Sequence, residues 1–382
     1  MDSYRFFLPT LIYNGEGCVK KNAKIICDFG RRAFIVTSQF IGGYRNYALD
    51  DVVSIFEENG IEYEINDAVE ENPSVESVHA IGKMVRTFDP DFIVGIGGGS
   101  SIDSAKAVNL LLAYPEDADP YQVFFGSGSF FGSLWPEGKL PLIGIPTTAG
   151  TGAEVTGGSV LTRADTDTKD SAFHKLYCTV TFLDGRYVRE SPSFLIHTGV
   201  MDALAHGVEN YVNTRSNFIT RSLADIGFKL FSEYKDNLIN DHLTDEDFDK
   251  MLVAANIFGW AFGQTGTTIP HGMGYPLSHF KQLNHGLSCS ITLGEYIRGF
   301  KDTGKVQHVI EACGFTSVDE FADYINEIIR RDVHISVTLA EIDRWTTEFC
   351  ELKDRFLRHP EPMTAEDVKN IYRRSLAPYI VD

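Results

Sequence analysis

Apolar and polar positions follow two alternating patterns along the first half of the chain. Short apolar runs predict buried strands, and the stretches between them, with apolar residues every three or four positions, predict amphipathic helices. The expected strands are Ala33–Thr37, Glu62–Asn66, Asp91–Ile96 and Leu140–Pro146. The expected helices lie at about 49–58, 75–87 and 101–112. This order predicts an α/β domain with a doubly wound, mostly parallel sheet.

The pattern changes after about Arg186. Strand-like runs become rare, and long helical patterns occupy 216–234, 245–259, 318–331 and 364–375. We therefore expect two domains, an α/β domain over 1–187 and an all-helical domain over 188–382. The segment 126–138 is rich in Gly, Ser and aromatic residues and is expected to be a surface loop.

Composition and charge narrow the classes of function. The 382 residues are 43% hydrophobic and 23% charged, as in ordinary globular proteins, and the formal net charge is −19. Because such a surface repels phosphate backbones and anionic lipids, we expect neither nucleic-acid nor membrane binding. The amino terminus does not resemble a secretory signal. Six scattered cysteines without a CxxC pair indicate reduced thiols in a cytoplasmic protein.

Two loops rich in glycine and threonine are candidates for phosphate binding. The first, 97–106, follows a predicted strand and opens a predicted helix, whose amino end offers free N–H groups and a positive dipole. Gly95, Gly97 and Ser100 match GxGxxG only in part, so a plain strand-to-helix turn remains an alternative. The second, 146–156, follows another predicted strand. Both loops would converge at one sheet edge, although a threonine-rich turn also remains open.

Four residues in the second half are candidate metal ligands. Asp202 and His206 are four positions apart in a helical pattern, so they share a helix face. His271 and His285 each stand beside a glycine in an apolar stretch. One carboxylate and three imidazoles suit Fe(II), Zn(II) or a related divalent ion. Each histidine alone is more commonly an ordinary hydrogen-bonded residue, and spacing does not prove that the four converge.

Four motifs stand in a characteristic order: GGGSSIDSAK, PTTAGTGAEVT, MDALAHGVENYV, and PHGMGYPLSH followed by NHG. Through them, and through Asn14–Gly17 and Glu71–Pro73, the chain resembles the iron-containing alcohol dehydrogenases from about residue 8 to about 300. The resemblance implies a dinucleotide-binding domain followed by a helical metal-binding domain, an architecture shared with dehydroquinate synthase. It also implies hydride transfer between a nicotinamide cofactor and a small alcohol or aldehyde, with a metal as Lewis acid, in a homodimer or larger homo-oligomer.

The resemblance also assigns roles to individual positions. The metal ligands would be Asp202, His206, His271 and His285. The cofactor contacts would be Asn72, Gly98, Gly99, Ser100, Asp103, Thr147, Thr151, Thr156 and Lys169, with Asp103 toward the nicotinamide. Phe262 would line the substrate pocket.

The chain departs from the family at two positions that matter for chemistry. Tyr275 stands where members often have a proton-relaying histidine, and a phenol with a pKa of ~10 is a poor base near neutrality. His279, one helical turn later, is a candidate substitute. Ser38 stands where an NAD-selecting aspartate would fall, and Arg45 follows nearby, although it suits a solvated surface equally well. We therefore expect NADP(H) rather than NAD(H), with Fe(II), or Zn(II) or Mn(II), as the metal.

Two other functions remain open from the sequence. A lyase of the dehydroquinate synthase type would cycle its nicotinamide within one turnover, without a net change in cofactor absorbance, and would need a more basic pocket than Phe262 suggests. A metal or redox sensor that had lost the proton relay would bind cofactor without turnover, and Tyr275 is the feature that favours it.

Overall fold

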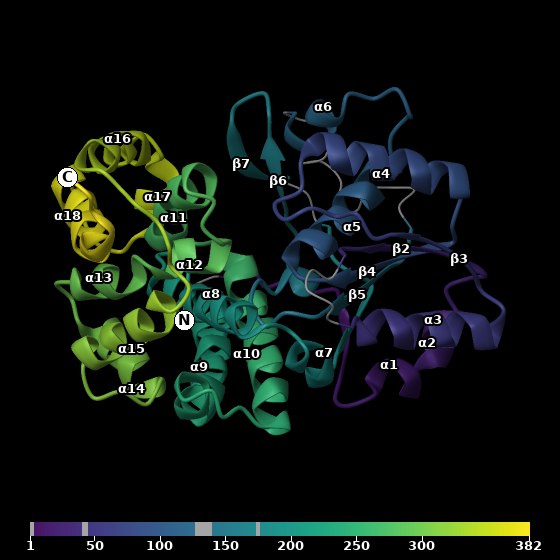
Figure 1. The fold of residues 1–382 in the computed structure, drawn as a ribbon, viewed down its shortest axis with the longest axis horizontal. Helices are drawn as coiled ribbons and strands as arrows, with labels where there is room; N and C mark the ends of the chain where they lie inside the picture. Colours follow the sequence, from purple (N-terminus) through teal and green to yellow (C-terminus); the bar gives the residue numbers. More distant parts are fainter. Residues whose placement is uncertain (1–3, 40–44, 127–139, 173–175) are drawn as a thin grey trace. The chain divides into compact units, whose positions relative to one another are not determined.

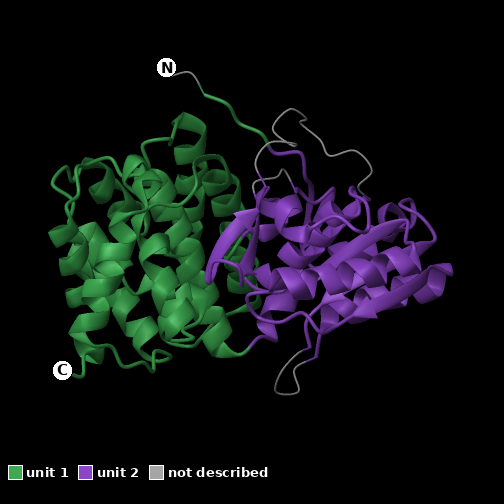
Figure 2. Cartoon of the chain, turned by 90° about the horizontal axis from the view of Figure 1, so that it is seen from above, with its two compact units in different colours: residues 1–7, 149–151, 192–382 green, residues 8–148, 152–191 purple. Residues whose placement is uncertain are grey.

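The computed structural model describes residues 4–39, 45–126, 140–172 and 176–382. The chain divides into two compact units, distinguished by colour in Figure 2. The α/β unit comprises Leu8–Thr148 and Gly152–Ser191, and the helical unit comprises Pro192–Asp382 with Ala149–Thr151 and the described residues up to Phe7. The loop expected at 126–138 lies, from residue 127 on, outside the described residues.

The α/β unit is built on a six-stranded parallel sheet. Its strands, in spatial order, are β1 (Leu11–Asn14), β8 (Val180–Leu183), β5 (Leu142–Pro146), β4 (Phe92–Gly97), β2 (Arg32–Thr37) and β3 (Glu62–Asn66). The four strands expected from the sequence are all present, within two residues at each end. Strands β1 and β8 were not expected from the sequence, because strands of four residues give little periodic signal.

Helices cover both faces of this sheet (Figure 1). One layer contains α1 (Cys18–Lys21), α2 (Ala23–Cys27), α3 (Tyr47–Asn59) and α7 (Gly185–Arg189), and the other contains α4 (Val75–Phe88), α5 (Gly99–Leu111) and α6 (Pro120–Phe125). Successive side chains of a strand point to opposite faces. Phe34 and Val36 therefore pack in one core, and Ala33 and Ile35 pack in the other. The doubly wound fold expected from the sequence is confirmed.

A small hairpin and a short turn complete the α/β unit. Strands β6 (Ser159–Arg163) and β7 (Thr168–Ala172) pair antiparallel in a separate two-stranded sheet. The 3₁₀ turn η1 (Ala153–Val155) precedes them.

The described residues of the helical unit form helices and one isolated bridge, between Val337 and Ile380. The first helices are α8 (Ser193–Val212), α9 (Phe218–Ile239), α10 (Asp245–Thr265), α11 (Ile269–Phe280) and α12 (His285–Ser290). The later ones are α13 (Leu293–Arg298), α14 (Gly304–Ala312), α15 (Val318–Arg330), α16 (Leu339–Cys350), α17 (Lys353–Arg358), α18 (Ala365–Ser375) and the 3₁₀ turn η2 (Ala377–Tyr379). The all-helical second half expected from the sequence is confirmed.

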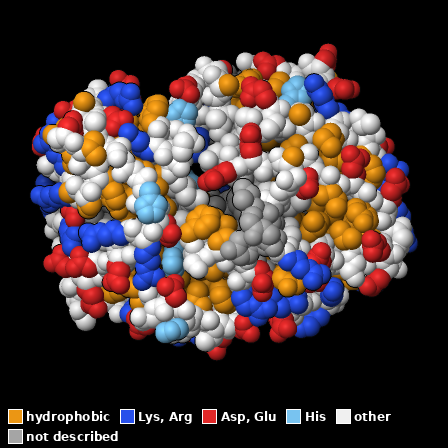
Figure 3. Space-filling model, in the orientation of Figure 1, with side chains coloured by type: hydrophobic (Ala, Val, Ile, Leu, Met, Phe, Trp, Pro, Cys, Tyr) orange, Lys and Arg blue, Asp and Glu red, His pale blue; other side chains and the backbone are white. Residues whose placement is uncertain are grey.

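Surface and cysteine features agree with an ordinary globular chain. Acidic and basic side chains are interspersed on the face that Figure 3 shows. Among the helices of the described ranges, none has both the length and the apolar character needed to cross a bilayer. All six cysteines are free thiols, and Cys18, Cys178, Cys289 and Cys313 are buried.

Candidate metal and nucleotide sites

Helix α8 carries three ionisable residues along one buried face. Asp202, His206 and Glu209 follow at intervals of four and three, which places them one above another on an α-helix. Their exposed fractions are 2%, 4% and 0%, respectively. Burying an isolated charge is costly, so three such groups on one helix indicate a shared partner.

Helices α11 and α12 bring two further imidazoles to this face. His271 Nε2 lies 3.4 Å from Asp202 Oδ1, and His285 Nε2 lies 4.0 Å from the same oxygen. His206 Nδ1 lies 3.9 Å from Asp202 Oδ2. The fold thus brings together the four residues that the sequence put forward as metal ligands, from three different helices.

Three buried atoms of this cluster have no hydrogen-bond partner among the described residues. They are Asp202 Oδ1, His206 Nδ1 and His271 Nε2. Leaving a buried polar atom unpaired costs about 1–3 kcal/mol each. Carboxylate oxygen and imidazole nitrogen are donors that divalent metals accept, so the residues fit the ion that the resemblance implies.

The charge states of two donors also suit a metal. Burial lowers the pKa of His206 to about 3, which keeps its imidazole neutral near pH 7. For Asp202, burial acts to raise the pKa, but the neighbouring histidines, His206 first, outweigh it and hold the pKa below its usual range. A neutral imidazole and an ionised carboxylate are the protonation states that coordinate metal ions.

Glu209 binds the imidazole of His271, and it was not a candidate site residue from the sequence. Its Oε1 pairs with His271 Nδ1, and its Oε2 accepts hydrogen bonds from Thr268 N at 2.5 Å and Thr268 Oγ1 at 3.1 Å. If the proton lies on Nδ1, the Nε2 lone pair of His271 is left for a metal. The signal was present in the sequence, because Glu209 lies seven residues after Asp202 on the same helix face.

Cys289 is a second residue of the cluster that was not expected from the sequence, where it is one of six scattered cysteines. Its Sγ lies 3.7 Å from His285 Nε2, one turn along α12. Asp202, His271, His285 and Cys289 form a group whose donor atoms all lie within 4.8 Å of one another. The spacing of four from His285 was the available signal.

The candidate substrate and proton-relay residues lie on α10 and α11. The Phe262 ring stacks on the His206 ring, with centroids 3.9 Å apart and planes 9° apart. The Tyr275 hydroxyl accepts a hydrogen bond of 3.0 Å from Arg355 Nη2, so its own proton can be donated elsewhere. Arg355, on α17, was not expected from the sequence. His279 packs edge-on against Phe280, with ring centroids 4.7 Å apart.

The two glycine-rich loops of the α/β unit meet beyond the carboxyl ends of β4 and β5. Thr147 N donates to Gly97 O at 3.0 Å. A Cβ added at Gly97, whose φ is +140°, would lie 2.6 Å from Ser101 Oγ and 3.9 Å from Ser38 Oγ. The chain leaves β2 and β4 in opposite directions, and ligands of open α/β sheets bind at such switch points. The expected convergence of the loops is therefore observed.

Most other candidate cofactor residues are tied into this framework. Asn72 N donates to Ser100 Oγ at 3.2 Å. Asp103 accepts from Lys106 Nζ at 3.2 Å and from Val160 N at 3.0 Å.

The hydroxyl of Thr156 lies 3.4 Å from Lys106 Nζ. Lys169 pairs with Thr162 in the β6–β7 hairpin, whereas Thr151 belongs to the helical unit by its contacts.

The two residues that bear on cofactor choice lie after β2. Ser38 forms an isolated bridge with Ala68. Arg45 is exposed, and its Nε lies 2.5 Å from Asp50 Oδ2. An exposed ion pair of this kind contributes little to stability.

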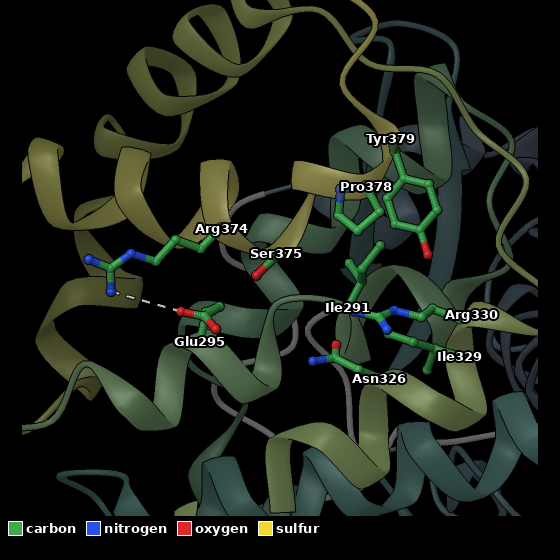
Figure 4. A pocket seen from close by; sticks show the side chains of 9 residues that line it. All are labelled: Ile291, Glu295, Asn326, Ile329, Arg330, Arg374, Ser375, Pro378 and Tyr379. Carbon is green, nitrogen blue, oxygen red and sulfur yellow. Dashed lines mark ion pairs between the residues drawn. The ribbon is translucent and has the colours of Figure 1, made fainter. Parts of the chain in front are cut away.

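A small pocket lies elsewhere in the helical unit, where α13, α15 and α18 contribute side chains (Figure 4). Glu295 and Arg374 point toward each other at one side of it, with Oε2 and Nη1 3.9 Å apart. Among the described residues that line it, none is a candidate metal ligand.

Comparison with known proteins decides the family. A model described as iron-containing alcohol dehydrogenase matches residues 9–185, and the C-terminal model of the Fe-containing alcohol dehydrogenase family matches residues 195–376. The chain belongs to the iron-containing alcohol dehydrogenase family. The family expected from the sequence motifs is thereby confirmed, and with it NAD(P)-dependent oxidoreductase activity on alcohols and aldehydes.

Individual relatives cover between 81% and 98% of the chain. The NADPH-dependent butanol dehydrogenase of Clostridium saccharobutylicum is 31% identical over 366 residues, covering 90% of this chain and 88% of that protein. The NAD-dependent methanol dehydrogenase of Bacillus methanolicus is 28% identical, covering 81% and 80%. An iron-containing alcohol dehydrogenase structure from Thermotoga maritima is 32% identical, with a TM-score of 0.86 over 98% of this chain and 100% of that one.

Proposed function

We propose that this dehydrogenase holds one divalent metal through Asp202, His206, His271 and His285, and reduces small aldehydes with NADPH or oxidises the matching alcohols. The observation that carries the proposal is the set of three buried ligand atoms without hydrogen-bond partners in one cluster. A bound divalent ion supplies Lewis-acid chemistry toward the substrate oxygen, and a nicotinamide supplies the hydride.

The residues around the donors position them. Glu209 orients the His271 ring through the hydrogen bond at Nδ1. Residues that bind a metal ligand in this way affect how tightly the ligand holds the metal. Phe262 holds the His206 ring by stacking and offers an apolar wall to a small substrate. The released proton leaves through Tyr275, whose hydroxyl Arg355 orients, or through His279.

The glycine and threonine loops bind the nicotinamide cofactor in this proposal. Backbone N–H groups of Gly98, Gly99 and Ser100, at the amino end of α5, bind the pyrophosphate. The remaining contacts come from Asn72, Asp103, Thr147, Thr151, Thr156 and Lys169. The meeting of both loops beyond β4 and β5 supports this role.

We favour NADP(H) over NAD(H) because Ser38 itself carries no carboxylate to repel a ribose 2′-phosphate, and because Arg45, in an exposed pair with Asp50, follows nearby in the chain. A relative that uses NADPH is consistent with this choice, although another relative uses NAD. Ser38→Asp should lower the NADPH-to-NADH ratio of kcat/KM by about tenfold or more, a cost of about 1.4 kcal/mol in discrimination. An unchanged ratio would remove Ser38 from the selection of the cofactor.

The assignment of a nucleotide-binding domain to 1–187 and a metal-binding domain to 188–382 belongs to the same proposal. The change between compact units at Ser191 and Pro192 supports it. We also propose a cytoplasmic homodimer or larger homo-oligomer. Free cysteines support the reducing compartment, and light scattering on the purified protein tests the oligomeric state.

The deciding experiment follows NADPH and NADH oxidation with a panel of short aldehydes. The protein is first stripped of metal and then refilled with Fe(II), Zn(II) or Mn(II). We expect oxidation only after refilling, and faster with NADPH. Full turnover in protein shown to be metal-free would contradict the proposal, whereas cofactor binding without any turnover would favour a sensor.

A further inference from the structure

Cys289 lies among the proposed metal ligands, although the proposed function gives it no task. Its thiol is buried, with 0% of the residue exposed. Among the described residues, it is the one cysteine that belongs to a group of converging metal donors. The other members of that group are Asp202, His271 and His285.

Two distances within the Cys289 group match those expected around a shared metal ion, and a third, from His285 Nε2 to Asp202 Oδ1, is longer at 4.0 Å. Two donors on one tetrahedral ion, sulfur at about 2.3 Å and nitrogen at about 2.1 Å, lie about 3.6 Å apart. Cys289 Sγ lies 3.7 Å from His285 Nε2 and 3.8 Å from His285 Nδ1. A nitrogen and an oxygen that are each about 2.1 Å from such an ion lie about 3.4 Å apart. His271 Nε2 lies 3.4 Å from Asp202 Oδ1.

The unpartnered atoms give a second, independent observation. Asp202 Oδ1 and His271 Nε2 are buried without hydrogen-bond partners, and both belong to the same group as the thiol. His206 Nδ1 also lacks a hydrogen-bond partner among the described residues, but His206 is the one proposed ligand that this group of four does not include. Its ring is held in a stack with Phe262.

We propose that Cys289 is a sulfur ligand of this ion, so that Asp202, His271, His285 and Cys289 form an O/N/N/S set. His206 and Cys289 are then alternative fourth ligands of a site that shares the other three. On binding, the thiol gives its proton to solvent and its sulfur forms one bond to the ion, with no change of oxidation state. Thiolate is a soft donor, so this set selects Zn(II) over Fe(II) and Mn(II). The inference rests on the proposed metal site.

Cobalt provides a spectroscopic test on the stripped full-length protein. Co(II) is titrated into the wild type, Cys289→Ser and the buried control Cys313→Ser. We expect a near-ultraviolet thiolate-to-cobalt charge-transfer band in the wild type and the control, and its loss in Cys289→Ser. In competition experiments, the preference for Zn(II) over Mn(II) should fall about 10–100-fold in Cys289→Ser.

The outcomes separate the two proposals. One equivalent of bound cobalt without the charge-transfer band would overturn the sulfur ligand and leave Asp202, His206, His271 and His285 as the site. No cobalt binding by the wild type would overturn the metal site and the sulfur ligand together. If Cys289→Ser does not fold, X-ray absorption of the zinc-loaded wild type decides, because a sulfur neighbour at about 2.3 Å is required.

Discussion

The candidate nucleotide site and the candidate metal site differ in how completely their buried polar atoms are hydrogen-bonded to other atoms of the chain. In the nucleotide loops, Asp103 binds Lys106 and Val160, Thr147 binds Gly97, and Ser104 Oγ is the one buried side-chain atom without a hydrogen-bond partner among the described residues. In the metal cluster, three buried ligand atoms have no hydrogen-bond partner among the described residues. The loops can therefore hold their shape without a ligand, whereas the cluster is left with uncompensated polar atoms until an ion binds.

The largest expected effect comes from removing a donor of the cluster. Asp202→Asn should reduce bound metal to background and lower kcat/KM by more than about 100-fold, because an amide is a far weaker ligand than a carboxylate. Metal analysis and NADPH oxidation measure the two effects. Asp236→Asn is the control, since that side chain is 80% exposed. If Asp202→Asn kept the metal content of the wild type, Asp202 would not be a metal ligand, and the contrast between the two sites would fail.

Metal removal should act more strongly on stability than cofactor removal. An ion present at about 100 times its dissociation constant stabilises the fold by about 2.7 kcal/mol, and about 2–4 °C of melting temperature corresponds to each kcal/mol in a unit of this size. Chelation should thus lower Tm by about 5–11 °C in scanning calorimetry. Asp202→Asn should not respond to the chelator, and an equal response would show that the ion stabilises another place.

A substitution of Glu209 tests whether the residue that binds His271 contributes to metal affinity. Glu209→Gln keeps the shape but removes the charge that pairs with His271 Nδ1, so metal affinity should fall about 10–100-fold. Competition with a chromogenic chelator measures this affinity. Glu246→Gln, with a 77% exposed side chain, is the control. If the two variants bind metal equally well, Glu209 has no part in orienting His271.

A substitution of Gly97 tests whether close packing holds the nucleotide loops in shape. Gly97→Ala places a Cβ 2.6 Å from Ser101 Oγ at a φ of +140°. We expect a loss of about 1–3 kcal/mol in the free energy of unfolding, together with weaker NADPH binding and unchanged metal content. Gly15→Ala has a similar φ of +118° but no atom within 4 Å. Equal losses in the two variants would leave backbone strain, rather than close packing, as the reason for Gly97.

The last prediction concerns His359, a buried imidazole outside both sites that does have a hydrogen-bond partner. Tyr296 OH lies 2.9 Å from His359 Nδ1, and burial lowers the pKa of His359 from 6.5 to about 4. The unfolded chain is therefore protonated first, so this stability is complete above pH 6.5 and is lost as the pH falls toward about 4.

The full loss corresponds to about 3 kcal/mol. Urea unfolding at several pH values measures it in the wild type and in His359→Asn, which does not titrate. The two proteins should differ in their pH slopes between pH 6.5 and about 4. Parallel slopes would show that other groups cause the acid sensitivity.

Much of the fold and of the site could be predicted from the sequence, because local periodicity carries the information. Continuous apolar runs marked β2, β4 and β5, which are buried on both faces, and helical spacing placed Asp202 and His206 on one side of α8. Motif order gave the family. These features depend on neighbours within a few residues, so the printed chain alone determines them.

Only the tertiary structure decided which distant residues join the site. Glu209 meets His271 across 62 positions, and Arg355 meets Tyr275 across 80. Cys289 joins Asp202 only because α12 packs against α8. Such contacts depend on how helices pack rather than on periodicity within a helix, and a buried polar atom reveals its missing partner only once its surroundings are in place.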